Sequence, residues 1–256
     1  MAASRRPRRR ADASLRDYRP ADASLCWQRS SSERQCVTRV CEAVKVTGAT
    51  HVDVRAFSCW NCHHATDCCS FFCKSCDAIQ PLHNGQHCDY FELFHLPKNF
   101  NLEQRKMEQT YWNLQKRLHP DLYGSKSEFE RELSAMNATI VNDAYKMLKT
   151  PNTRVKYLLA LHGIDALSET SSTAVDPQLL MQTMELRERV EEAKTIQELD
   201  AIRREVSAQI DTIINKLGEV YDNKKDLEAT KQFAVELQYM VKCAEEIDMR
   251  EEQLEP

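Results

Sequence analysis

From about residue 89 onward, apolar residues recur every three or four positions, the spacing that places them on one face of an α-helix. One such stripe predicts a helix over 102–118 and consists of Met107, Tyr111, Leu114 and Leu118. A second stripe predicts a helix over 127–149 and consists of Phe129, Leu133, Met136, Ile140, Ala144 and Met147. Between them, Pro120 excludes continuous helix because its ring pushes the preceding residue out of the helical region. We therefore expect two antiparallel helices joined by a rigid loop, with Asn101 as the N-cap of the first.

The remaining pattern predicts one short helix and then three long ones. The short helix covers 153–162 and ends at Gly163, which suits a left-handed cap. A stretch of Ser, Thr and Ala without periodicity follows over 164–175 and indicates a domain boundary. Asp176 and Pro177 then give a strong helix start, a capping carboxylate followed by proline in the first turn. Three helices with short connections predict an antiparallel bundle, over 177–194, 196–221 and 226–250.

Composition supports a mainly helical protein, because only 5 residues are Gly and 8 are Pro, whereas 29% are charged. No apolar run approaches the roughly 20 residues that a membrane helix needs, so we expect a soluble protein. The charge is unevenly distributed. Residues 1–58 hold 12 Lys and Arg against 6 Asp and Glu, whereas residues 176–256 hold 11 against 20. A basic beginning and an acidic end indicate different roles for the two ends.

The first thirty residues are rich in arginine and serine and have no apolar core of a secretory signal. The arginines are Arg5, Arg6, Arg8, Arg9, Arg10, Arg16, Arg19 and Arg29. This composition is typical of a mitochondrial transit peptide. A disordered basic tail and a nuclear or nucleic-acid-binding patch are the alternatives. No motif marks residues 31–56, whose role stays open.

Most of the cysteines precede residue 77, and four of them form two C-x-x-C pairs ten residues apart, namely Cys59, Cys62, Cys73 and Cys76. Two close thiolates on each of two turns supply four soft ligands, which suits one structural, tetrahedral zinc ion. Few apolar residues lie here, so the metal would supply the folding energy. Redox dithiols and disulfides are the alternatives. The choice of ligands stays open because of His63, His64, Cys68 and Cys69.

The tripeptide His119-Pro120-Asp121 follows the helix over 102–118. The face of that helix opposite its core stripe carries Arg105, Gln109, Trp112 and Lys116, with Lys106 and Arg117 to one side. The loop therefore ends a basic, solvent-facing surface, for which an ordinary solvated helix end is the alternative interpretation. A role for His119 as a general base is rejected, because no nucleophile or second catalytic group accompanies it. We expect no catalytic residues.

These motifs resemble the J-domain family, and within it the HscB type. The resemblance covers about residues 89–256 and runs through Asp89–Phe94, Leu118–Asp121, Val141–Leu148, Arg154–Gly163 and Leu180–Glu188. The tetracysteine segment before it looks like the zinc module that animal HscB proteins carry and bacterial ones lack. Together these segments are far more specific than the tripeptide alone.

The resemblance implies a binding role. J-domains bind a DnaK-type heat-shock chaperone and stimulate its ATPase, which here would involve His119, Pro120, Asp121, Arg105, Lys116 and Arg117. The basic face would steer the chain toward an acidic partner surface. Pro120 would lower the cost of ordering the loop, and Asp121 would accept charge-assisted bonds from a partner arginine. Trp112 departs from the pattern, since a smaller polar residue is expected on this face.

On the helix over 177–194, two apolar sets compete for the bundle core. One stripe consists of Leu179, Thr183, Leu186 and Val190. The roughly opposite side carries Leu180, Met181 and Met184 together with Glu185, Glu188 and Glu192. An exposed apolar patch rimmed by acids is typical of a protein-binding site, whereas packing against the preceding domain is the alternative. The family resemblance implies that an iron–sulfur scaffold of the IscU type binds this side, with Tyr239 of the last helix contributing.

The sequence thus predicts a mainly α protein in which a small zinc-binding module precedes a J-domain helical hairpin and an antiparallel three-helix bundle. We expect a transit peptide with a disordered segment over 1–56 and a zinc module over 57–78. A J-domain over 89–163, a linker over 164–175 and a scaffold-binding bundle over 176–256 should follow. The predicted function is a co-chaperone in iron–sulfur cluster biogenesis that delivers the scaffold to the chaperone.

The predicted location is the mitochondrial matrix, and a cytoplasmic pool is left open. We expect no nucleic-acid or membrane partner, and a homodimer is left open. A thiol–disulfide oxidoreductase that uses the C-x-x-C pairs is the alternative function. A zinc-containing nucleic-acid binder is disfavoured, because the basic run lies outside any predicted element and the bundle is acidic.

Overall fold

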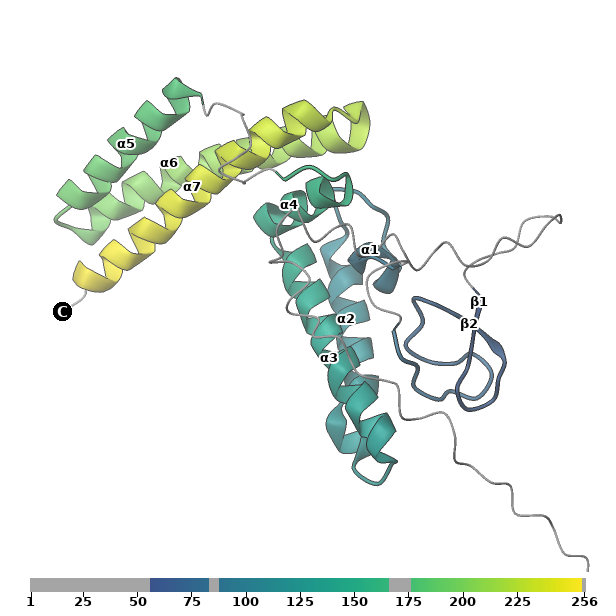
Figure 1. The fold of residues 1–256 in the computed structure, drawn as a ribbon. Coiled ribbons are helices and arrows are strands. Elements are labelled where there is room, and N and C mark those ends of the chain that lie inside the picture. Colours follow the sequence, from purple (N-terminus) through teal and green to yellow (C-terminus); the bar gives the residue numbers. More distant parts are fainter. Residues whose placement is uncertain (1–55, 83–87, 166–175, 255–256) are drawn as a thin grey trace, which may run out of the picture. The chain divides into compact units, whose positions relative to one another are not determined.

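The computed structural model describes residues 56–82, 88–165 and 176–254 (Figure 1). The expected transit peptide, the unassigned stretch up to residue 55 and nearly all of the expected linker lie outside these described residues. Among the residues described, no helix is both long enough and apolar enough to cross a bilayer.

The described chain is mainly helical, which confirms the expected fold class. After a two-stranded β-hairpin formed by β1 (Ala56–Ser58) and β2 (Ala65–Asp67), every regular element is helical. The helices are α1 (Tyr90–Leu93), α2 (Gln104–Leu118), α3 (Glu128–Lys149), α4 (Pro151–Leu161), α5 (Pro177–Glu192), α6 (Ile196–Leu217) and α7 (Leu227–Leu254). Helices α2 and α3 pack against each other as a hairpin, and α5, α6 and α7 form a bundle.

Capping side chains explain where several helices begin. Ser127 and Thr195 start α3 and α6 with capping boxes, in which the hydroxyl accepts an N–H three residues on and a glutamate returns the bond. Asp176 accepts the N–H of Gln178 at the start of α5, and Pro177 occupies the first turn, as expected. After α4, Gly163 adopts a φ of 74°, the left-handed conformation expected from the sequence.

The start of α2 differs from the prediction. The helix begins at Gln104 with Glu103 at its N-cap, and no side chain caps it. Asn101 is instead held by its backbone N–H, which donates to Oδ2 of Asp222 at 2.9 Å. The expected N-cap was wrong, and the Asp222 carboxylate, far along the chain, instead binds the backbone of Phe100 and Asn101 ahead of the helix.

The buried face of α3 is rotated by about one position from the predicted stripe. The buried residues of α3 include two polar side chains, Ser134 and Asn137. The Ser134 hydroxyl donates to the carbonyl of Leu118 at 2.7 Å, and the Asn137 amide donates to the carbonyl of Gln80 at 3.0 Å. A stripe defined by apolar residues alone misses these positions, because buried polar groups are accepted where they meet a backbone partner.

Helix α7 is the element that the other bundle helices share, since it contacts α4, α5 and α6. Helix α6 packs into the bundle through an apolar stripe of Leu199, Ile202, Val206, Ile213 and Leu217, all buried. The expected end of this helix was only partly right. Residues Gly218–Lys224 continue it as a π-helical segment, which ends at Lys225 in a left-handed conformation.

That π-helical segment contacts the chain just before α2. Oδ1 of Asp222 accepts the N–H of Phe100 at 2.6 Å, next to the bond already described to Asn101. Gly218 permits this approach, because a Cβ there would overlap the Asn101 amide. His162 and the Tyr221 hydroxyl are also hydrogen-bonded, at 3.2 Å. The hairpin and the bundle are therefore in direct contact.

Arg154 of α4 is buried and donates three hydrogen bonds to backbone carbonyls. Its Nε donates to Leu148 at 2.7 Å, one Nη to Phe100 at 2.6 Å and the other Nη to Lys149 at 3.0 Å. Burial lowers the pKa of the guanidinium, and the nearby carboxylate of Asp222 opposes this shift. One side chain thus satisfies two carbonyls at the end of α3 and one carbonyl of the segment before α2.

Arg154→Met should lower the free energy of unfolding by about 3 kcal/mol or more, because several carbonyls lose their donors at about 1–3 kcal/mol each. Arg131→Met on the exposed side of α3 is the control, with an expected change within about 0.5 kcal/mol. Urea denaturation followed by circular dichroism gives both values. A loss below about 1 kcal/mol for Arg154→Met would contradict this account.

Candidate metal centre and partner-binding surfaces

The two C-x-x-C pairs lie on two similar hairpin turns. The first pair lies between β1 and β2, whose antiparallel register pairs Ser58 with Ala65. The second pair lies between Phe72 and Ile79, which form an isolated antiparallel bridge. Short β pairing on both sides of each turn therefore presents the thiols at the turn's tip.

The backbone bonds of the two turns match one another. In the first, the N–H of Cys59 donates to His64 at 2.8 Å and the N–H of His63 donates to Cys59 at 2.9 Å. In the second, the corresponding bonds link Cys73 with Ala78 and Asp77 with Cys73, each at 2.9 Å. His63 and Asp77 both have positive φ, 61° and 56°. Each residue that follows a pair is therefore bent into the left-handed region, which closes the turn.

The four thiols of these turns converge. Their sulfur atoms all lie within 4.8 Å of one another, with Cys59 3.7 Å from Cys76 and Cys62 3.6 Å from Cys73. A tetrahedral thiolate site with metal–sulfur bonds of about 2.3 Å has sulfur–sulfur edges of about 3.8 Å. The donor set and its spacing therefore fit a metal ion.

Polar hydrogens point at three of these sulfurs, and the side-chain amide of Asn61 donates to Cys76 at 3.6 Å. The N–H groups of Asn61 and Ser75 donate to Cys59 and Cys73, each at 3.4 Å, and the Gln80 amide donates to Cys59 at 3.2 Å. Burial raises the pKa of the Cys59 thiol, but N–H groups of Cys62 and Asn61 and the neighbouring thiols outweigh it and lower the pKa to about 6. This shift favours the thiolate form of Cys59, which is the form that binds a metal.

The other candidate ligands named from the sequence lie elsewhere. Within the described residues, neither His63 nor His64 belongs to a group of side chains close enough to share an ion. Cys68 and Cys69 belong to a separate group with Asp67, and Cys69 forms a disulfide with Cys88. Sequence reasoning missed this disulfide, because the spacing of two cysteines does not reveal which of them pair.

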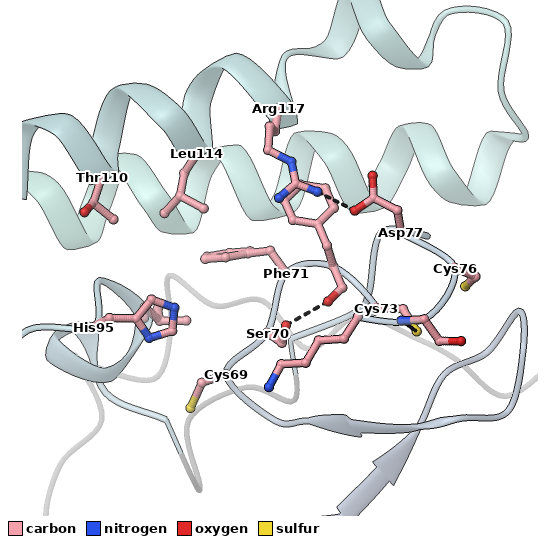
Figure 2. Close-up of a pocket in the computed structure, with 14 residues that line it drawn as sticks. Cys69, Ser70, Phe71, Cys73, Cys76, Asp77, His95, Thr110, Leu114 and Arg117 are labelled. Atoms are coloured by element: carbon pink, nitrogen blue, oxygen red, sulfur yellow. Dashed lines mark hydrogen bonds and ion pairs between the residues drawn. The ribbon is translucent and has the colours of Figure 1, made fainter.

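We call residues 56–82 the cysteine module, and it packs against the α2–α3 hairpin. The Trp60 indole donates to the carbonyl of Ile79 at 2.6 Å, and its ring meets Phe129 of α3 edge-on at 5.4 Å. Arg117 at the end of α2 lies 3.7 Å from the centre of the Phe72 ring and forms an ion pair with Asp77 at 2.5 Å. Figure 2 shows Arg117 extending from its helix to Asp77, beside a pocket also lined by Leu114 and Cys69.

The His-Pro-Asp tripeptide forms an exposed turn after α2. Pro120–Tyr123 make one 3₁₀ turn, and the side chains of His119 and Asp121 are 59% and 88% exposed. Nδ1 of His119 accepts the N–H of Asp121 at 3.4 Å, and Tyr123 reaches back to the carbonyl of Arg117 at the same distance. The turn is thus internally bonded while the Asp121 carboxylate faces solvent.

The basic face of α2 is exposed but not uniformly available. Arg105 and Lys116 are exposed, and neither forms an ion pair with another described residue. Arg117 differs, because the cysteine module already binds its guanidinium. Trp112 is 66% exposed, so the bulky ring that departs from the expected pattern lies on the surface.

Helix α5 separates its two apolar sets. Thr183, Leu186 and Val190 are buried in the bundle, with Leu179 partly buried. Met181 and Met184 are 72% and 63% exposed, Leu180 is exposed to a lesser degree, and three acids on the same side are exposed, namely Glu185, Glu188 and Glu192. We call these six residues the α5 face. Tyr239 is half-buried and packs against the core.

Known proteins give an independent comparison. Residues 175–248 match the family described as the HSCB C-terminal oligomerisation domain. The mouse iron–sulfur cluster co-chaperone protein HscB is 34% identical over 194 residues, which span 75% of this chain and 81% of the relative. The chain belongs to the HscB family. The crystal structure of human HscB aligns with a TM-score of 0.67 and 31% identity, covering 76% of this chain and 98% of that one.

A bacterial member is also similar. HscB from Vibrio cholerae aligns with a TM-score of 0.57 and 33% identity, covering 65% of this chain and 99% of that one. The likeness to these structures confirms the mainly helical fold class that the sequence predicted.

Proposed function

We propose that this chain is a co-chaperone in iron–sulfur cluster biogenesis, which binds an IscU-type scaffold and delivers it to a DnaK-type heat-shock chaperone. The observation that carries the proposal is the presence on one chain of an exposed His-Pro-Asp turn and an exposed apolar face rimmed by acids. Family membership supports it, because the mouse and human relatives bear the name iron–sulfur cluster co-chaperone.

The turn after α2 supports contact with the chaperone. Asp121 offers an exposed carboxylate for charge-assisted bonds with an arginine of the ATPase. The 3₁₀ turn and Pro120 fix the backbone beforehand, so little entropy is lost when the partner binds. Arg105 and Lys116 supply positive charge that accelerates encounter with an acidic surface. We assign Arg117 a smaller share of this contact, because it is bound by Asp77 and Phe72.

The α5 face supports contact with the scaffold. Its three apolar side chains are held in solvent although the opposite side of the same helix fills the bundle core. Exposed methionines adapt their shape to a partner, and acids at the border favour a basic one. Half-buried Tyr239 offers its exposed part only, so we expect it to contribute less than Leu180 or Met184.

We further propose that the cysteine module holds one structural zinc ion on Cys59, Cys62, Cys73 and Cys76. Zinc supplies charge neutralisation and crosslinking to a segment with little core of its own. The alternative, a thiol–disulfide oxidoreductase, is disfavoured because the four sulfurs converge on hairpin turns instead of lying at a helix N-terminus. The arginine-rich beginning supports a mitochondrial matrix location.

Purified protein should carry about one zinc ion per chain, and Cys59→Ser and Cys76→Ser should lose it because each removes one thiolate. His63→Asn and His64→Ala are the controls and should retain the metal, since neither histidine joins the cluster. Elemental analysis after gel filtration measures the content. Full retention in both cysteine variants, or loss in a histidine variant, would show that the ligand set is different.

Asp121→Ala should reduce the stimulation of the chaperone ATPase by roughly ten- to a hundred-fold, the effect of losing a hydrogen bond between charged groups. The fold should persist, because Asp121 lies in an exposed turn. Glu132→Ala, an exposed acid of α3, is the matched control and should stimulate normally. Single-turnover ATP hydrolysis provides the rates. Native stimulation by Asp121→Ala would remove the basis for this mechanism.

Leu180→Ala with Met184→Ala should weaken scaffold binding by about 1–2 kcal/mol for each side chain, roughly five- to thirty-fold apiece. Leu161→Ala, a truncation of an exposed leucine on α4, should leave affinity unchanged. Titration calorimetry measures the affinities, and circular dichroism verifies the fold. The double variant should still stimulate the ATPase alone and fail only in the extra stimulation caused by scaffold. Unchanged scaffold affinity would place the binding site elsewhere.

A further inference from the structure

A disulfide joins the cysteine module to the start of the helical hairpin. Cys69 follows β2 by two residues, and Cys88 directly precedes Asp89, the N-cap of α1. The two cysteines are 19 positions apart in the sequence, and both side chains are partly exposed. Neither belongs to the group of four converging thiols.

The segment closed by this disulfide contains the second cysteine turn. Cys73 and Cys76, half of the candidate metal ligands, lie between Cys69 and Cys88. With the disulfide closed, the chain that carries these two ligands has fewer conformations when the metal is absent. Binding a metal then costs less ordering entropy, so the closed form should retain the ion longer.

A third thiol lies beside the disulfide. The sulfur of Cys68 is 3.6 Å from that of Cys69, and the Cys69 sulfur is 3.7 Å from a carboxylate oxygen of Glu92. Cys68 is buried and its thiol donates to the Asp67 carboxylate, so the thiolates that attack this disulfide come from solution. A partly exposed disulfide is open to such attack, in contrast to one enclosed in a core.

We propose that Cys69 and Cys88 form a reversible disulfide that equilibrates with glutathione-type disulfides and sets how firmly the cysteine module retains its metal. In the oxidising direction, one protein thiolate attacks a sulfur of glutathione disulfide, forming a mixed disulfide and releasing one glutathione thiolate. The second protein thiolate attacks the protein sulfur of that mixed disulfide and releases the other glutathione. Two electrons and two protons pass from the cysteines to glutathione, and excess glutathione reverses both steps.

The thiol assignment is tested on the full, zinc-loaded chain equilibrated in glutathione buffers from reducing to oxidising. The samples are quenched with acid, alkylated and mapped by peptide. Two more cysteines should escape alkylation in oxidising than in reducing buffer, and these should be Cys69 and Cys88. Cys88→Ser should abolish this change, whereas Cys68→Ser should preserve it and is the matched control. Alkylation of both cysteines at every ratio, or a linkage between Cys68 and Cys88, would overturn the assignment.

The effect on the metal is tested by zinc release to a chromogenic chelator. Release should be several-fold slower from the oxidised than from the reduced wild type, and Cys88→Ser should release at the reduced rate in both buffers. Equal rates from both wild-type forms would overturn the link between disulfide and metal. A second zinc ion bound by the reduced chain at Cys68, Cys69 and Cys88 would also overturn that link, because the bound ion would block oxidation of these thiols.

This second part rests on the proposed zinc site, and the two failures are distinguishable. Absence of zinc from the reduced wild type would refute the zinc site itself. Bound zinc with redox-independent release would refute only the inference drawn here. Neither readout depends on the ATPase or on the scaffold.

Discussion

Phe100 is bonded through both its N–H and its carbonyl, and this joint holds the helical hairpin to the bundle. Its N–H donates to Asp222 beyond α6, and its carbonyl accepts from Arg154 of α4. The residue is 1% exposed, so its N–H and carbonyl would be costly to leave without hydrogen bonds. The turn after α2 and the α5 face therefore belong to one folded unit, although a featureless stretch separates them in the sequence.

The helices could largely be predicted because their cores are apolar and periodic. The three helices of the bundle form as expected, and α5 begins at the predicted Asp176-Pro177 start because capping there depends only on neighbouring residues. The joint could not be predicted, because it depends on a carboxylate meeting an N–H 122 positions away. The same applies to Asn137, whose burial depends on a carbonyl in the cysteine module. The periodicity of apolar residues predicts which face of a helix is buried. It does not predict a polar contact between segments that are distant in the sequence.

The candidate sites also differ in how far local sequence patterns predict them. The two C-x-x-C turns and the two sides of α5 follow from spacing alone, since a C-x-x-C pair is a local turn and helix geometry fixes opposite faces. The meeting of the two turns, which leaves His63 and His64 out of the cluster, depends on tertiary packing. Arg117 shows where such reasoning fails. Its position on α2 predicts a free positive charge, yet Phe72 and Asp77 bind it. Whether a charged side chain is free to bind a partner depends on which other segment packs beside it. The periodicity of a single helix does not reveal that neighbour.

The two left-handed residues of the cysteine turns have a consequence for how the module folds. His63 and Asp77 have side chains, so each positive φ costs roughly 1–2 kcal/mol that glycine would not. Contacts with the hairpin offset part of this cost, because Trp60 meets Phe129 and Arg117 binds Phe72 and Asp77. The proposed zinc ion would offset the rest through its bonds to the four sulfurs. The conformation of two residues beside the cysteines would then make the stability of the module depend on the supply of metal, while the hairpin and the bundle keep cores of their own.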